Sequence, residues 1–221
     1  TLEPRLAMYF SSASTELRVL LTPAMRQQLR ADYEVAAALC IKMGMRSCKE
    51  LREAWMVRCE DRGLSEADLA TLATLGSVLP ALKTLILAGG RLKLSSNSAC
   101  PDGVPRLAEG LGAGSLPAVV SIGIYDMHMG EAGASALAAA LGRGALPRLK
   151  FFALIFAAIG DAGLVALVPA LRRLIALESI DLIGNPLGDE GLAALVAPPP
   201  AGTPLLPTGG LKKLKAVSYT H

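Results

Sequence analysis

Aromatic residues are scarce in this sequence: Phe, Trp and Tyr together make up 4% of the 221 residues. Hydrophobic residues nevertheless reach 52%, and charged residues only 19%. This composition excludes a disordered chain, because it allows a large apolar surface to be buried. Leu, Ala and Val must fill the core in place of aromatic rings, and small aliphatic side chains of this kind suit closely stacked, repeated elements.

Residues able to hold a metal ion or perform catalysis are also few. No two cysteines have the C-x-x-C spacing of a zinc site. The sequence contains no G-x-S-x-G motif, no H-E-x-x-H motif and no phosphate-binding loop. We therefore expect a protein that is not an enzyme and has no metal or cofactor, with reduced, partly buried thiols, although a disulfide stays open. The histidines and cysteines are His128, His221, Cys40, Cys48, Cys59 and Cys100.

A strong charge imbalance is lacking as well, since the formal net charge is +3. Nucleic-acid binding needs a clustered basic face, so we expect no nucleic-acid partner. No signal peptide is visible in residues 1–20, which favours an intracellular compartment, cytoplasmic or organellar, over secretion. Residues 151–171 have about the length of a membrane span, but Gly160, Asp161 and Pro169 interrupt them, so we expect no transmembrane helix.

What the sequence does contain is an internal repeat. Residues 177–195 follow the pattern L-x-x-I-x-L-x-x-N-x-L-G-D-x-G-x-x-x-L. Further full or partial copies occupy residues 54–72, 82–92 (resuming at Gly103), 119–137 and 149–167, and a last strand is expected in 211–217. In each copy the apolar residues of the first half alternate, which predicts a strand with one buried side.

The spacing of the copies is nearly regular. Their second apolar anchors follow one another at intervals of 28, 37, 30, 28 and 34 residues, which indicates a period near 28 with insertions. The insertions fall around residues 95–102, 142–145 and 198–207, where loops are tolerated. The anchors are Val57, Leu85, Ile122, Phe152, Ile180 and Leu214.

This combination of a strand half, a G-D/E-x-G turn and an L-x-x-x-L helical half resembles the ribonuclease-inhibitor-like class of leucine-rich repeats. The turns begin at Gly130, Gly160 and Gly188 and are the most specific part of the likeness, which covers residues 54–217. The resemblance implies an α/β solenoid, with a curved parallel sheet on the concave side and outer helices on the convex side. The family usually places an Asn at each strand end; here only Asn185 does so, so apolar packing must hold the other repeats.

The turns also suggest how each helix begins. Asp161 and Asp189 follow the first glycine of their turns, and we expect each carboxylate to cap the helix that follows, because the exposed amides at a helix start favour a negative charge. One repeat cannot bury its own apolar face, so the repeats must stack on one another.

Residues 1–53 differ from the repeats and are expected to form a helical cap, followed by about five repeats and a closing strand in residues 54–221. Thr22 before Pro23 predicts the start of a helix, and Gly44 predicts its end. A solenoid needs a cap over its open end. The alternative is that these helices dock a partner. Pairs with the spacing of capping boxes are Ser47 with Glu50 and Ser65 with Asp68.

The positions between the apolar anchors should face solvent on the concave side, yet several are apolar. Adjacent strands are about 4.8 Å apart, so these side chains should form one patch. Such patches mark binding sites, and aromatic residues concentrate binding energy. We predict that a protein partner, or a lipid or pigment in a larger assembly, covers this apolar patch. The alternative is that the N-terminal segment or residues 198–210 fold over the patch. The predicted partner-binding residues are Ile86, Tyr125, Asp126, Phe151, Ile155, Phe156, Asp181 and Ile183.

These features predict a non-catalytic scaffold for protein–protein interaction, such as a peripheral subunit of a larger membrane or photosynthetic complex. The alternative is a regulator of an enzyme, such as a small-GTPase activator or a hydrolase inhibitor. Some proteins with this repeat type activate small GTPases through specific polar loop residues, and this sequence shows no match to them.

Overall fold

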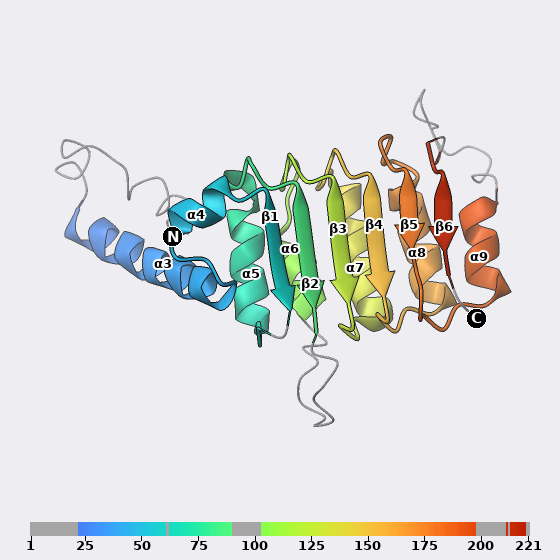
Figure 1. The fold of residues 1–221 in the computed structure, drawn as a ribbon, viewed down its shortest axis with the longest axis horizontal. Helices are drawn as coiled ribbons and strands as arrows, with labels where there is room; N and C mark the ends of the chain where they lie inside the picture. Colours follow the sequence, from blue (N-terminus) through green and yellow to red (C-terminus); the bar gives the residue numbers. More distant parts are fainter. Residues whose placement is uncertain (1–21, 61, 90–102, 198–210, 212, 220–221) are drawn as a thin grey trace.

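The computed structural model describes residues 22–60, 62–89, 103–197, 211 and 213–219, and Figure 1 shows its arrangement. Six parallel strands form one sheet, in which each strand pairs with its neighbours in chain order. An α/β fold with a parallel sheet is therefore confirmed. The strands are β1 (Met56–Glu60), β2 (Thr84–Ala88), β3 (Ser121–Tyr125), β4 (Phe151–Ile155), β5 (Ser179–Asp181) and β6 (Ala216–Ser218).

Each of the first five strands is followed by a helix, and successive helices pack against one another. In Figure 1 the helices α6, α7 and α8 lie behind the strands, and α5 and α9 lie at the two ends of that layer. We call the opposite side of the sheet the open face. The helices are α5 (Glu66–Leu75, continued by a short 3-10 turn at Gly76–Val78), α6 (Gly103–Gly110), α7 (Gly130–Gly142), α8 (Asp161–Leu171) and α9 (Asp189–Val196).

The pairing register confirms five of the six predicted anchors and corrects the sixth. Val57, Leu85, Ile122, Phe152 and Ile180 lie directly opposite one another in successive strands. The residue opposite Ile180 in β6 is Val217, so the prediction of Leu214 was wrong. Leu214 instead occupies the first apolar position of the pattern, because its amide bonds to Leu211 just as Leu177 bonds to Leu174.

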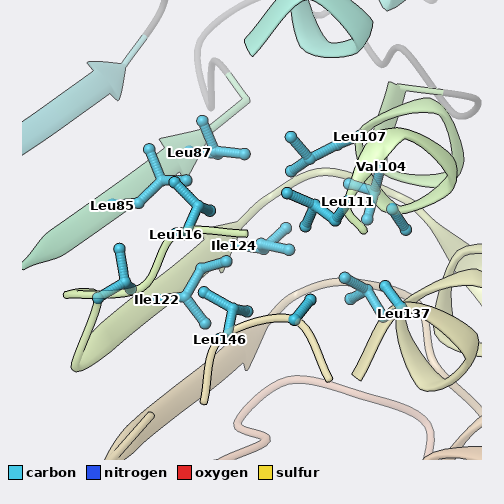
Figure 2. Packing of buried hydrophobic residues seen from close by; sticks show 14 of the residues in the cluster. Leu85, Leu87, Val104, Leu107, Leu111, Leu116, Ile122, Ile124, Leu137 and Leu146 are labelled. Carbon is cyan, nitrogen blue, oxygen red and sulfur yellow. The ribbon is translucent and has the colours of Figure 1, made fainter. Parts of the chain in front are cut away.

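The core lies between the sheet and the helices. Figure 2 shows strand residues such as Leu85 and Ile122 facing helix residues such as Leu107 and Leu137, and all four are essentially inaccessible to solvent. Burying a leucine side chain stabilises a protein by about 2 kcal/mol. Each of the five strand–helix units contributes buried apolar side chains from both layers, so neighbouring units pack through one continuous apolar core.

A common backbone bend precedes the last five strands. In each bend an amide donates to the carbonyl three residues earlier, at distances from 2.9 to 3.3 Å. The next residue then donates to the preceding repeat, so that one row of backbone hydrogen bonds extends the sheet beyond the strands. The donors of the bends are Leu82, Val119, Leu149, Leu177 and Leu214, and the residues in the row are Trp55, Lys83, Val120, Lys150, Glu178 and Lys215.

Asn185 ties two repeats together in the manner that the resemblance implies. Its side-chain oxygen accepts from the amides of Ala157 and Ile159, each at 3.1 Å. Its side-chain nitrogen donates to the carbonyls of Leu154 at 2.6 Å and Leu182 at 2.8 Å. The Asn185 side chain is only 5% exposed. Its hydrogen bonds therefore satisfy two backbone amides and two backbone carbonyls that solvent would not reach.

The expected capping role of Asp161 is wrong. Gly160, not an acidic residue, is the N-cap of α8, and no side chain caps that helix. The Asp161 carboxylate instead accepts from the amide of Gly188 in the next repeat at 2.7 Å. A Cβ atom on Gly191 would lie 2.5 Å from this carboxylate, so the second glycine of the turn makes room for the Asp of the preceding repeat. Asp189 likewise lies inside α9 and does not cap it.

Two arginines join the helix ends. Arg143, after α7, donates to the carbonyls of Ala108 at 2.8 Å and Leu111 at 3.0 Å, where α6 ends. Arg172, after α8, donates to the carbonyl of Ala194 at 2.9 Å in α9, and also to Ala197. A cation at the negative end of a helix dipole is favourable, so each guanidinium satisfies carbonyls that the neighbouring helix leaves unpaired.

The N-terminal helices are α3 (Pro23–Lys42) and α4 (Cys48–Glu53). Thr22 caps α3 by accepting from Met25 at 3.2 Å, and Gly44 has the positive φ of +80° that ends the helix, as predicted. Helix α3 contacts α4 and α5 and continues away from the sheet in Figure 1.

The two predicted capping boxes differ. Ser65 and Asp68 form the full reciprocal pair at the start of α5. Ser47 accepts from Glu50, but the Glu50 carboxylate accepts from the amide of Arg46, one residue before the expected position. That pair is therefore only half a capping box.

Residues 151–171 divide into β4 and α8, as the repeat predicts. Within the described ranges, no helix combines the length and the apolar character that crossing a membrane requires.

Candidate binding face

The open face presents the outward residues of the strands in rows across the sheet. The strand register places Ile86 opposite Gly123 and Ala88 opposite Tyr125, and Tyr125 opposite Ile155. The side chains of Ile86, Tyr125 and Ile155 are half-buried, whereas the inward side chains beside them are fully buried. These predicted residues therefore lie on the open face, on three adjacent strands.

A hollow of about 450 Å³ lies over the carboxyl end of β2. Three lining residues, Ile86, Ala88 and Gly89, come from β2 and the residue after it, and the others come from β1, from β3 with the residue after it, and from β4. Arg58 and Glu60 form an ion pair of 2.6 Å at its β1 side. The hollow includes four of the eight predicted residues and is lined by Arg58, Glu60, Ile86, Ala88, Gly89, Tyr125, Asp126 and Ile155.

The ring of Tyr125 determines the shape of this region. A Cβ atom on Gly123 would lie 2.5 Å from the ring, so the tyrosine lies flat along its own strand over the glycine. The absence of a side chain at position 123 is what allows this. The Tyr125 ring thus covers the middle residue of β3.

The other four predicted residues lie beyond the hollow. Phe151, at the start of β4, is 48% exposed, and Phe156, just after β4, is 40% exposed. Phe156 has a φ of +50°, and its ring lies against Gly184, where a Cβ atom would be 2.3 Å from it. Asp181 accepts from the amide of Ile183 at 3.2 Å, and both residues are half-buried. The predicted patch is therefore a hollow and two separate exposed rings.

The sequence pattern places a charged row at solvent-facing positions before the strands, and sequence reasoning assigned no role to it. Glu178 lies between Lys150, at 3.0 Å, and Lys215, at 2.6 Å. Hydrogen bonds from Lys215 and Lys150 lower the pKa of Glu178 to about 2. The alternation of cationic residues at equivalent positions of successive repeats was the available signal. We call these exposed side chains the cationic rim: Lys83, Arg148, Lys150, Lys213 and Lys215.

A second hollow, of about 540 Å³, lies beside β1 and α4. Trp55 lines it and is 61% exposed, together with Met45 and Met56. Charged residues of α4 form its other side, so each of the two hollows combines apolar and charged side chains.

Neither hollow is lined by a described histidine or cysteine. His128 is exposed next to α7, away from both linings. Burial raises the pKa of the Cys40 thiol to about 12 and that of Cys59 to about 11, which keeps both protonated and unreactive. The Sγ atoms of Cys40 and Cys48 are 3.6 Å apart without a disulfide. The described part of the chain contains no cluster of His, Cys, Asp or Glu suited to a metal ion.

No known family model matches the chain, and no curated protein matches it. The open face presents both apolar and charged side chains that are available for noncovalent contact.

Proposed function

We propose that this chain is a leucine-rich-repeat solenoid of the ribonuclease-inhibitor-like class. Three features support this assignment. The strand register repeats from β1 to β6, the same backbone bend precedes five strands, and helices contact their sequential neighbours. The contacts of Asn185 with the preceding repeat agree with the role that this residue has in the family. In such a solenoid each repeat is stabilised by its neighbours, and one long face stays available for binding.

The function that this geometry supports best is that of a non-catalytic scaffold, which binds another protein through the open face as a subunit of a larger complex. The observation that carries the proposal is the exposure of Phe151 and Phe156 at the two ends of β4, outside the lining of the hollow over β2. Burying a phenylalanine side chain is worth about 2–3 kcal/mol, so rings left half in water gain stability when a partner covers them. Aromatic residues of this kind concentrate the energy of protein interfaces.

The test compares two double variants in a native pull-down with quantitative mass spectrometry. Phe151→Ser with Phe156→Ser removes both rings from the open face. Val165→Ser with Ile175→Ser is the control, because these side chains are 40% and 55% exposed and lie outside the sheet. We expect the first variant to lose its stoichiometric partner and the control to keep it, with both folded by circular dichroism. Retention of the partner by the phenylalanine variant contradicts the proposal.

Two further assays distinguish a protein partner from the alternatives, which are a lipid or pigment ligand and a role as a regulator of an enzyme. A lipid or pigment is detected by extraction and mass spectrometry of the purified protein. A regulator of an enzyme changes the rate of GTP hydrolysis or of a hydrolase in the presence of the chain, whereas a scaffold leaves those rates unchanged.

A further inference from the structure

The residues that precede the strands form a continuous row, because each amide donates to the carbonyl of the preceding repeat. Val120 donates to Lys83 at 2.8 Å, Lys150 to Val120 at 2.8 Å, and Lys215 to Glu178 at 2.7 Å. The lysines of this row stand before β2, β4 and β6. Adjacent strands are about 4.8 Å apart, so lysines on alternate strands are about 10 Å apart.

The row is strongly cationic. Glu178 is its one carboxylate, and it is already shared by Lys150 and Lys215. Lys83 forms no ion pair with the described residues, and Arg148 and Lys213 are exposed two positions before Lys150 and Lys215. The five cations of the rim therefore exceed the carboxylates beside them, and a ligand that supplies negative charge is favoured there.

We propose that the cationic rim binds an extended, acidic segment of the partner, with carboxylates about three residues apart; this inference rests on the proposed function. In the extended polyproline II conformation a chain advances about 3.1 Å per residue with three residues per turn. Every third side chain then lies on the same side, about 9 Å from the previous one, which is close to the spacing between alternate strands. Phe151 follows Lys150 directly and is exposed beside the rim, where it provides an apolar contact for the same segment.

The position of Glu178 favours a peptide over a nucleic acid. A peptide can place a neutral residue opposite Glu178 and carboxylates opposite Lys83 and the lysines on either side of Glu178. A nucleic acid carries a phosphate at every nucleotide, so it cannot avoid the negative charge in the middle of the row.

The experiment measures binding of labelled synthetic peptides to the whole chain by fluorescence anisotropy. One peptide has Glu at every third position around a central Leu, and its control has Gln at those positions; polyuridylate is the nucleic-acid probe. The rim variant carries Lys83→Gln, Arg148→Gln and Lys213→Gln, which leaves the contacts of Glu178 intact. The matched control, with the same loss of charge away from the rim, carries Lys49→Gln, Arg106→Gln and Arg173→Gln.

We expect the unmodified chain to bind the Glu peptide about tenfold more tightly than the Gln peptide, since exposed ion pairs contribute up to about 1 kcal/mol each. The rim variant keeps Lys150 and Lys215 and should therefore lose part of this preference, whereas the control variant should keep all of it. Equal losses in both variants, no preference in the unmodified chain, or tighter binding of polyuridylate would overturn the inference. The proposed function is judged separately, by whether the Phe151 and Phe156 variant loses its protein partner.

Discussion

Replacing Asn185 by alanine should loosen the junction between the repeats of β4 and β5. The substitution removes the side-chain groups that satisfy the amides of Ala157 and Ile159 and the carbonyls of Leu154 and Leu182. Because the site is almost fully buried, these backbone groups cannot turn to bulk solvent without a local opening.

The magnitude follows from the number of bonds lost. A hydrogen bond contributes about 1 kcal/mol net, and a buried group left unpaired costs about 1–3 kcal/mol. Four bonds lost, with a water molecule entering the space left by the amide, give a destabilisation of about 3–4 kcal/mol. This is a large share of the roughly 5–15 kcal/mol that stabilises a typical protein.

Two measurements test this value. Urea unfolding should show a midpoint lowered by about 1–2 M, and the control Ser135→Ala, on the exposed side of α7, should stay within about 0.5 kcal/mol of the unmodified chain. By hydrogen exchange, the amides of Ala157 and Ile159 should exchange at least about a hundredfold faster. A loss below about 1 kcal/mol, or unchanged exchange of these two amides, would refute the reasoning.

Three further outcomes are expected. The pKa of Glu178 is depressed to about 2, so its pairing stabilises the fold above the ordinary pKa of 4.5 and is lost as the pH falls towards 2. Acid unfolding of Glu178→Gln should lack this contribution; identical acid transitions would contradict it. Gly123→Ala should destabilise the chain by no more than about 1 kcal/mol, because the outer atoms of the half-buried Tyr125 ring can move away from the new Cβ atom. In a Tyr125→Ala background the same change should cost nothing by urea unfolding, and an unaltered cost would exclude the ring as its cause. Finally, because the thiols of Cys40 and Cys59 are buried with raised pKa values, iodoacetamide at pH 8 should label them only in the denatured chain, as followed by peptide mass spectrometry. Rapid labelling of the folded chain would show that these sites open.

Much of the fold could be predicted because its signal is periodic. The alternation of residues such as Leu85 and Leu87, recurring at nearly regular intervals, predicts both the strands and their inward side. Leu214 was assigned to the wrong position because the short last copy offers three apolar residues at the same three-residue spacing. Only the hydrogen bonds of the bend distinguish the first apolar position from the second.

The roles of polar side chains were harder to predict, since they depend on the neighbouring repeat. Asp161 has the sequence context of a helix cap, but the amide of Gly188 in the next repeat is the group that it reaches. The Glu50 carboxylate accepts from the amide of Arg46 and not from the expected amide of Ser47. The spacing in the sequence determines which amides are near the carboxylate, and the backbone conformation determines which of them donates to it.

The candidate site was predictable in position and less so in shape. The repeat pattern placed Ile86, Tyr125 and Ile155 on the outward side of the strands. It could not show that the Tyr125 ring lies over Gly123, because the rotamer of a half-buried ring depends on the space that its neighbours leave.

The arginines at the helix ends and the lysines of the rim respond differently to dissolved salt. Arg143 and Arg172 are partly covered and contact carbonyl dipoles at short range, where mobile ions screen little. The lysines of the rim are exposed, and at about 0.1 M ionic strength their attraction is screened beyond about 10 Å. If the rim binds the acidic segment proposed above, raising the ionic strength should therefore weaken that binding more than it weakens the contacts between the helices. Salt should then release the segment while the protein itself stays folded.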